Sequence, residues 1–299
     1  MPELSHHAGA AALIGRPNVG KSTLLNRLVG YRVAATADKP QTTRHRIQGI
    51  VSSEDHQIVF VDTPGLHRRT GSTLNRVLNL AARAALEEVD VVVMLVEAGE
   101  WREGDDYVLE VLQGVPTPVL LAVNKVDRIA DKSALLAYID SVRTRREFAE
   151  IIPISAQRGT NLDRLEAQIV ARLPLGPPVY PEDQITDRPM RFIVAELIRE
   201  QAMRLLRQEV PYAVAVEIEA YEEQPEIVRI GAILWVERDA QKAIVIGKGG
   251  SMLKRIGMRA RESLESVLET KVFLKLWVKV SDNWQDDERK LARLGIDLH

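Results

Sequence analysis

The sequence predicts an α/β protein in two parts: a mostly parallel sheet with helices on both faces, then a smaller α+β domain. Three features indicate this arrangement. Short apolar runs alternate with amphipathic stretches up to residue 173, five prolines follow within residues 173–189, and a different order of elements comes after them. Buried parallel strands are near-continuous apolar runs separated by helices, and prolines are excluded from helix interiors and central strands.

Six runs in the first part have the composition of buried strands, and amphipathic stretches separate most of them. The expected strands are "AAALIG", "RIQGIVSS", "QIVFVDT", "DVVVMLVE", "PVLLAVNK" and "EIIPIS". The expected helices lie at 21–30, 72–89, 131–148 and 161–173. We therefore expect a first domain over residues 8–173, followed by a stiff linker at 174–189.

Residues 190–299 show a second pattern, which begins with a long amphipathic helix at 191–209. Two alternating or apolar runs, 212–221 and 226–237, are typical of a β-hairpin. After them we expect a short helix, a glycine-rich turn, a longer helix, a strand at 271–280 and a last helix at 286–294. This order predicts a separate α+β domain over 190–299.

Composition excludes several kinds of site. The 299 residues contain no cysteine, which rules out disulfides, cysteine metal sites and thiol catalysis and agrees with a reducing cytosol. The net charge of −2 favours no partner, so only local patches of charge are informative. The longest apolar runs are far too short to span a bilayer, and the first residues lack the pattern of an export signal. We therefore expect a cytoplasmic protein.

The stretch "GRPNVGKS" at 15–22 has the spacing of a phosphate-binding loop. It follows an expected strand and opens an expected helix, which is the context that this motif requires. The backbone N–H groups and the helix N-terminus would face phosphate oxygens. Lys21 would reach the β- and γ-phosphates, and the Ser22 hydroxyl would bind Mg²⁺. The alternative is an ordinary glycine-rich turn.

Two further stretches complete an expected site for Mg²⁺ and the γ-phosphate. "DTPG", residues 62–65, ends a strand, so Asp62 can hold Mg²⁺ through water and the Gly65 N–H can sense a γ-phosphate. "KPQTTRHRI" at 39–47 lies between the first helix and the second strand. We expect Thr43 to be the Mg²⁺ ligand in this loop, with Thr42 as the alternative.

The base is predicted from "NKVD" at 124–127, which ends the fifth strand. The Asp127 carboxylate can accept both the N1–H and the N2 amine of guanine, an arrangement that adenine lacks. The stem of Lys125 can lie across the ring. "SAQRG", beginning with Ser155 and Ala156, follows the sixth strand and can offer backbone N–H groups to the guanine O6. In this order the motifs predict binding of GTP and GDP.

Leu66 occupies the position at which Ras-like enzymes carry the glutamine that orients the attacking water. An aliphatic side chain can neither orient nor deprotonate water, so unassisted hydrolysis should be slow. Assistance could come from a partner protein or RNA, or from a monovalent cation such as K⁺ in the role of an arginine finger. Asn18 in the phosphate loop is placed to ligate such a cation. The alternative is a loop asparagine that makes a local turn bond.

The second part contains the turn Gly247-Lys248-Gly249-Gly250 between two helical segments. A G-x-x-G turn allows close approach of a nucleic acid backbone, and the next helix presents its N-terminus to phosphate. Between residues 241 and 261 there is no acidic residue, and six are basic: Lys242, Lys248, Lys254, Arg255, Arg259 and Arg261. With the order of elements, this cationic strip predicts an RNA-binding KH domain of the bacterial ribosomal type. The alternative is a tight turn with a solvated basic face.

The motifs "GRPNVGKSTLLN", "KPQTTRHRI", "DTPGLH" and "NKVD", followed by a KH domain, make the chain similar to the Era family of bacterial GTPases over nearly its whole length. The resemblance implies a Ras-like P-loop domain joined to a type II KH domain. It implies binding of the 3′ end of 16S rRNA and a role in maturation of the small (30S) ribosomal subunit, by a monomer. Leu66 agrees with the family, which also has an aliphatic residue there.

The resemblance also implies roles for single residues. Asn124 and Asp127 would read guanine, Ser22 and Thr43 would ligate Mg²⁺, and the 247–250 turn with its basic neighbours would hold RNA. The phosphates would be held by Asn18, Val19, Gly20, Lys21, Ser22 and Thr23.

Two competing functions remain at this point. One is a GTP-dependent signalling or cell-division switch whose KH fold binds a protein or the membrane surface, with peripheral association on the cytoplasmic face. The other is an ATP-driven RNA remodeller, which Asp127 and the lack of a second motor domain oppose.

Overall fold

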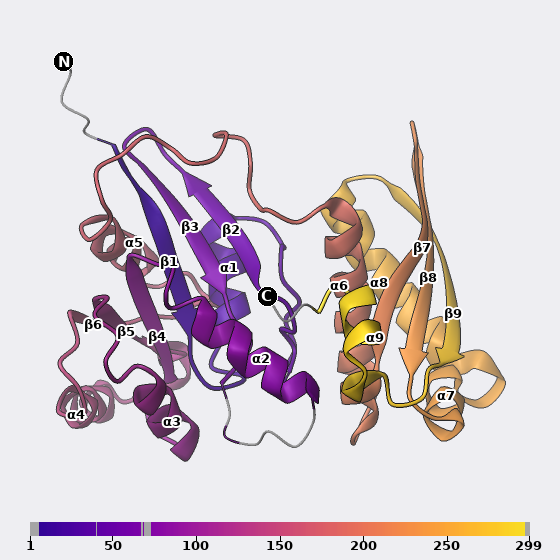
Figure 1. Cartoon of the computed structure of the whole chain (residues 1–299), viewed down its shortest axis with the longest axis horizontal. Helices are drawn as coiled ribbons and strands as arrows, with labels where there is room; N and C mark the ends of the chain where they lie inside the picture. Colours follow the sequence, from indigo (N-terminus) through magenta and orange to yellow (C-terminus); the bar gives the residue numbers. More distant parts are fainter. Residues whose placement is uncertain (1–5, 40, 67, 69–72, 297–299) are drawn as a thin grey trace. The chain divides into compact units, whose positions relative to one another are not determined.

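The computed structural model describes residues 6–39, 41–66, 68 and 73–296, which form two compact units (Figure 1). Unit 1 comprises the described residues of Met1–Val33, Thr43–Thr70 and Leu78–Asp187. Unit 2 comprises those of Ala34–Thr42, Gly71–Val77 and Arg188–His299. Across the described part of the chain, no helix combines the length and the apolar character needed to cross a bilayer.

Unit 1 contains a six-stranded sheet in the order β2-β3-β1-β4-β5-β6. Only β2 runs antiparallel, against β3, and the other neighbours are parallel. This confirms the predicted mostly parallel sheet, in which the central strands are continuous apolar runs because both faces are covered. The strands are β1 His7–Ile14, β2 Ile47–Ser52, β3 His56–Asp62, β4 Val91–Glu97, β5 Val119–Asn124 and β6 Glu150–Pro153.

Helices cover both faces of this sheet. One face packs against α2 (Thr73–Ala84), α3 (Glu103–Val111) and α4 (Lys132–Arg143) through a buried core that includes Met94 of β4 and Leu121 of β5. The other face is contacted by α1 and α5, which span Lys21–Val29 and Leu162–Val170. The strand order brings the carboxyl ends of β1, β3, β4 and β5 to one edge, where ligands bind in open α/β sheets.

The proline-rich stretch that follows α5 lies along unit 1. Ala8 N donates to Pro174 O over 3.1 Å, and Ile50 N donates to Ile185 O over 2.9 Å. The Thr186 hydroxyl donates to Gln48 O over 2.7 Å. The backbone of β2, an edge strand, is therefore partly paired by this stretch, which leaves fewer of its polar groups open to other chains.

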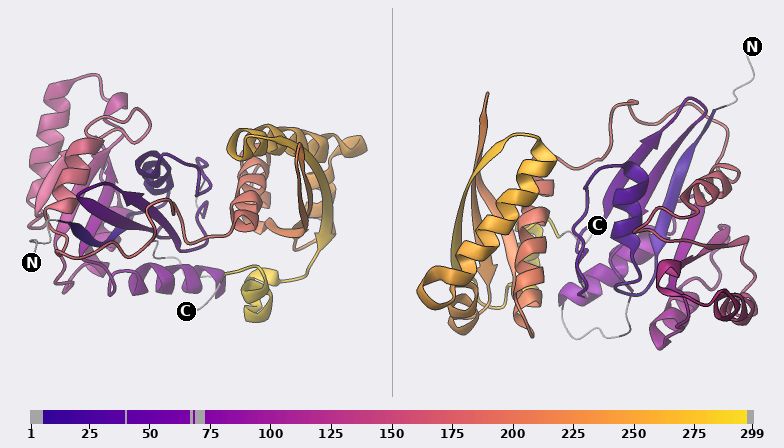
Figure 2. Two further views of the ribbon diagram at one scale, coloured as in Figure 1. Left: turned by 90° about the horizontal axis from the view of Figure 1, so that it is seen from above. Right: turned by 180° about the vertical axis from the view of Figure 1, so that it is seen from behind.

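Unit 2 contains the sheet β7-β8-β9, with β7 and β8 antiparallel and β8 and β9 parallel. Helices α6 (Met190–Leu205) and α8 (Ser251–Leu268) pack on one face of this sheet (Figure 2). This confirms the predicted hairpin and the helix–strand–strand–helix–turn–helix–strand order. The other elements are β7 Ala215–Gln224, β8 Ile227–Val236, α7 Asp239–Ile246, β9 Lys271–Val280 and α9 Glu288–Arg293.

A segment that is distant in sequence completes unit 2. Residues 34–39, 41 and 42 are held on α6 by buried charged side chains: Arg199 donates to Thr42 O, and Glu200 accepts from Thr36 N over 2.8 Å. Arg204 donates to Thr36 O over 2.9 Å. The loop that leads to Thr43 is thus fixed by several hydrogen bonds to charged groups, each stronger than a neutral one.

Candidate functional site

The phosphate loop connects β1 to α1 and depends on glycine at two positions. Gly20 has φ +106°, and a Cβ there would lie 2.3 Å from Asn124 Nδ2. A Cβ on Gly15 would lie 2.7 Å from Leu95 O. Any side chain at either position would displace the neighbouring backbone or the buried asparagine. The strand–loop–helix context expected from "GRPNVGKS" is therefore present.

Lys21 lies buried beneath this loop, at the first turn of α1. Its Nζ donates to Gly15 O over 3.1 Å and to Arg16 O over 3.2 Å. Burial lowers the pKa of Lys21 to about 8, with the nearby Asp62 carboxylate opposing the shift. The ammonium group therefore sits inside the ring of backbone groups that the motif uses to bind phosphate.

Ser22, Thr43 and Asp62 meet at the end of β3. Ser22 Oγ donates to Asp62 Oδ2 over 2.7 Å and lies 2.6 Å from Thr43 Oγ1, which lies 3.3 Å from the same carboxylate oxygen. Among the described residues, buried Asp62 Oδ1 has no hydrogen-bond partner, and burial raises the pKa of Asp62 to about 6.

This donor set fits Mg²⁺, which prefers hydroxyl and carboxylate oxygens and retains several waters. The structure also distinguishes the two candidate threonines. Thr42 Oγ1 donates to Lys39 O over 2.6 Å within its own loop, whereas Thr43 faces Asp62. The geometry therefore favours Thr43, the predicted residue, over Thr42.

Asn124 connects the phosphate loop to the loop after β6. Its Nδ2 donates to Val19 O over 2.8 Å, and its Oδ1 accepts from Ala156 N over 3.0 Å. Asn124 is almost fully buried. Both ends of the amide are engaged with protein, so the side chain holds the two loops at a fixed separation. The backbone N–H of Ala156, which was expected to donate to the guanine O6, donates to Asn124 in this structure.

Asp127 lies on the short 3₁₀ turn Val126–Arg128 that follows β5. Ser155 Oγ donates to Asp127 Oδ1 over 2.5 Å, and Arg158 Nε is 4.0 Å from Oδ2. Ser155 is fully buried, so its hydrogen bond holds the Asp127 carboxylate in one orientation. A rigidly held pair of carboxylate oxygens is the arrangement that selects the two donors of guanine.

Leu66 packs in the hydrophobic core of unit 1, in the same cluster as Ile14 and Met94. Its backbone N donates to Gly15 O over 3.2 Å. A Cβ on Gly65 would lie 2.8 Å from Pro17 Cα, so the "DTPG" turn lies directly against the phosphate loop. The Leu66 side chain points into the core and has no means to orient a water molecule.

Asn18, the expected K⁺ ligand, has φ 66° and is exposed on the loop. Within the described chain no hydrogen bond is recorded for its side chain. The local turn bond proposed as the alternative is therefore not made. Thr23 follows Ser22 in the first turn of α1.

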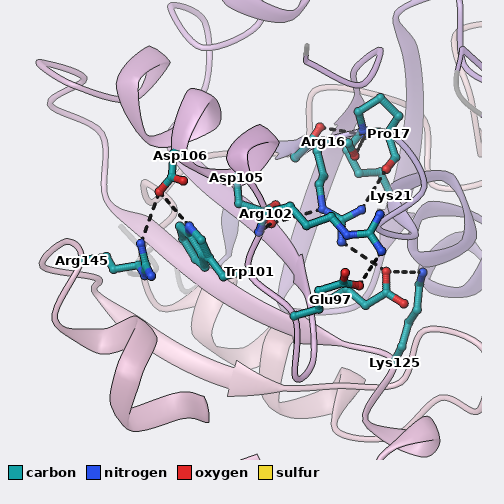
Figure 3. Close-up of polar contacts among 12 residues, drawn as sticks. Arg16, Pro17, Lys21, Glu97, Trp101, Arg102, Asp105, Asp106, Lys125 and Arg145 are labelled. Carbon is teal, nitrogen blue, oxygen red and sulfur yellow. Dashed lines mark hydrogen bonds and ion pairs between the residues drawn. The ribbon is translucent and has the colours of Figure 1, made fainter. Parts of the chain in front are cut away.

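Three charged residues near this site were not anticipated from the sequence. Arg16, inside the phosphate loop, contacts Asp105 Oδ2 through Nε and Glu97 Oε2 through Nη2, both over 3.2 Å (Figure 3). Lys125 Nζ reaches the same Glu97 oxygen over 2.9 Å. Glu97 is the last residue of β4 and lies at the edge of the sheet where the nucleotide motifs meet. Its position at the end of a buried strand is the sequence feature from which a role in the site could have been predicted. Asp105 lies on α3, which was not expected as a helix.

The glycine-rich turn of unit 2 lies between α7 and α8. All three glycines have positive φ: +72° at Gly247, +59° at Gly249 and +80° at Gly250. A Cβ on Gly247 would lie 2.7 Å from Met252 Cβ, whereas Cβ atoms on Gly249 and Gly250 would meet nothing within 4 Å. The first glycine is required by packing, and the last two leave open space above the backbone, as a phosphate contact requires.

The basic residues around this turn face solvent. Among the described residues no acidic partner is recorded for the exposed side chains of Lys248, Lys254, Arg255 and Arg259, whereas Arg261 is 3.9 Å from Glu265. Ile244 and Met258 are 45% and 49% exposed on the flanking helices. Unpaired cations on an exposed surface attract the phosphate groups of a nucleic acid backbone.

Comparison with known proteins agrees with both halves of this description. A family profile described as a 50S ribosome-binding GTPase matches residues 10–125, and a KH-domain profile matches residues 209–285. GTPase Era of Stenotrophomonas maltophilia (strain R551-3) is 50% identical over 292 residues, which cover 98% of both chains. GTPase Era of Xanthomonas campestris pv. campestris (strain B100) has the same identity and coverage.

Two solved structures are similar over almost the whole chain. One is a single-residue variant of Aquifex aeolicus Era bound to GDP and AlF4⁻, at 39% identity and a TM-score of 0.91, covering 97% of this chain and 99% of that one. The other is Era in complex with MgGDPNP and nucleotides 1506–1542 of 16S ribosomal RNA, with the same identity and TM-score, covering 98% and 99%. The Ras-like and KH folds are thus confirmed, as is hydrolysis of GTP to GDP and phosphate. The chain belongs to the Era family of GTPases.

Proposed function

We propose that this GTPase binds the 3′ region of 16S rRNA through its KH domain and acts as a switch in assembly of the small ribosomal subunit. Within this proposal residues 8–173 form the GTPase domain, 174–189 the linker and 190–299 the KH domain. The protein works as a monomer in the cytoplasm, where ribosomal subunits are assembled.

One observation carries the RNA proposal: the exposed turn at 247–250 with its unpaired cations. Phosphate contacts of this kind are sequence-independent and sensitive to salt. The relative solved with nucleotides of 16S rRNA, at 39% identity, supports that RNA as the ligand. The description of the matching GTPase profile names the large subunit instead, so the experiment must distinguish the two subunits.

The test is crosslinking of the full-length protein to RNA in cell lysates supplied with either GTP or GDP, followed by sequencing of the bound RNA fragments. We expect reads from the 3′ end of 16S rRNA that disappear when Lys248 and Gly249 are both replaced by aspartate. Reads from 23S rRNA would move the function to the large subunit. Crosslinks to protein alone, or recovery with membranes, would support the signalling or cell-division switch.

For the chemistry, we propose that Lys21 and the loop backbone from Asn18 to Thr23 bind the phosphates, while Gly65 senses the γ-phosphate. Asp127 reads the base, and Lys125 covers its ring. Ser22, Thr43 and Asp62 hold Mg²⁺, which would neutralise phosphate charge when bound. Leu66 leaves the attacking water without a protein acid or base, so charge stabilisation must come from another source. We propose K⁺ held by Asn18 as that source.

A further inference from the structure

Glu97 lies between two of the nucleotide motifs although it belongs to neither. It is the last residue of β4, and its backbone neighbour in the sheet is Asn124 of β5. Ala98 N donates to Asn124 O over 2.8 Å, so the strand end is fixed to the start of the "NKVD" turn. The carboxylate therefore emerges from a rigid element at the edge where the motifs meet.

The Glu97 carboxylate is a bridge between cations from both motifs (Figure 3). Its Oε2 accepts from Lys125 Nζ over 2.9 Å and from Arg16 Nη2 over 3.2 Å. Its Oε1 lies 3.5 Å from Arg128 Nη1. The side chains of Glu97 and Lys125 are only 18% and 19% exposed, and that of Arg16 is 7% exposed. Such shielded, charge-assisted contacts are stronger than surface ion pairs.

The consequences of this bridge extend to the phosphate loop. Arg16 O accepts from Lys21 Nζ, so the residue that Glu97 holds also carries one of the two backbone acceptors of the phosphate-binding lysine. At the other end, fixing Nζ of Lys125 restrains the whole stem of that side chain. A stem with its end already fixed loses less rotamer entropy when a base packs against it.

We propose that Glu97 is a positioning residue for nucleotide binding, which holds Lys125 alongside the guanine ring and Arg16 at the base of the phosphate loop. The proposal rests on the assignment of Lys125 to the base. Because Glu97 acts through Lys125 and Arg16, its loss should raise the rate of nucleotide release and leave the choice of guanine over xanthine, which belongs to Asp127, unchanged.

The experiment measures dissociation of a fluorescent N-methylanthraniloyl GDP from the full-length protein by stopped flow. The variants are Glu97→Ala, Glu97→Gln, Lys125→Ala and the double variant Glu97→Ala/Lys125→Ala. The matched control is Glu100→Gln, since Glu100 lies on the same segment, is half exposed and pairs with Arg102. Thermal unfolding of each variant reports on folding, and Glu97→Gln, which keeps the shape of the side chain, carries the test if Glu97→Ala is unfolded.

We expect dissociation to be faster by about tenfold or more in Glu97→Ala, the equivalent of about 1.4 kcal/mol, with a smaller effect in Glu97→Gln. The control should release nucleotide as the wild type does. The double variant should release nucleotide more slowly than the product of the two single effects predicts, because both substitutions remove the contact between Glu97 and Lys125. Additive effects, or a rate within twofold of wild type for Glu97→Ala, would overturn the inference. An unchanged rate for Lys125→Ala would instead contradict the assignment of Lys125 to the base.

Discussion

The nucleotide site of unit 1 and the glycine-rich turn of unit 2 are built in opposite ways. In unit 1 the polar groups are buried and bonded to one another: Asn124 joins two loops, and Ser155 fixes Asp127. Around the turn of unit 2, Lys248 and Lys254 are exposed, and no acidic partner for either is recorded among the described residues. Buried networks select one ligand by geometry, whereas solvated cations attract any polyanion.

The largest change in ligand affinity should come from a substitution in the buried nucleotide site of unit 1. Asp127→Asn turns one of the two carboxylate acceptors into a donor that faces the donors of guanine. We expect GTP affinity to fall by a factor on the order of 10⁴ and binding of xanthosine triphosphate to improve. Equilibrium titration with both nucleotides measures this change.

The matched control is Asp131→Asn, because Asp131 caps α4 and asparagine caps a helix equally well. RNA binding should be unchanged in both variants. Wild-type GTP affinity in Asp127→Asn would show that the carboxylate does not read the base.

The second prediction concerns the exposed glycine-rich turn of unit 2. Replacing Lys248 and Gly249 by aspartate places two carboxylates where a phosphate would bind, so RNA affinity should fall by a factor on the order of 100 at about 0.1 M salt. GTP binding should remain intact. Gel-shift titration at several salt concentrations gives the affinity and its salt dependence.

A single exposed cation of the same unit on strand β9, Lys271, provides the control variant Lys271→Asp. Equal losses in the turn variant and in this control would mean that binding depends on net charge and not on the turn.

A third prediction sharpens the contrast at the level of the backbone. Gly20→Ala places a Cβ against Asn124 Nδ2 at a positive φ, and should destabilise the fold by about 2–4 kcal/mol through strain and a broken buried hydrogen bond. Gly249→Ala meets open space and should cost only about 1 kcal/mol. Thermal unfolding of the full chain compares the two. Similar decreases in the unfolding temperature of both variants would show that Gly20 is no more tightly packed than Gly249.

The smallest expected effect concerns Leu66 and Asn18. If K⁺ stabilises the charge that develops during hydrolysis, GTP turnover should be about tenfold faster in K⁺ than in Na⁺ at equal ionic strength, a part of what an arginine finger supplies. Asn18→Ala should abolish the difference and spare GDP binding. Phosphate release with and without RNA is the measurement. Equal rates in the two salts under both conditions would favour a group supplied by a partner.

The sequence by itself determined the order of the elements apart from α3, and it predicted the nucleotide site. Strand composition and glycine-rich turns are local properties, because period, length and φ requirements are set by neighbouring residues. For this reason the hairpin of β7 and β8 and the loop before Lys21 were predictable. The motifs "DTPG" and "NKVD" could be assigned because parallel strands place their carboxyl ends at one edge.

Only the tertiary structure decided which side chains meet. Glu97 and Asp105 are separated from Arg16 by more than 80 residues, and no periodicity relates them. Helix α3 is short and acidic, and it was not expected from the sequence. The burial of Leu66 against β1 and β4 depends on strands that are far apart in the sequence. Contacts of this kind arise from packing distant segments into one core, which local sequence patterns do not encode.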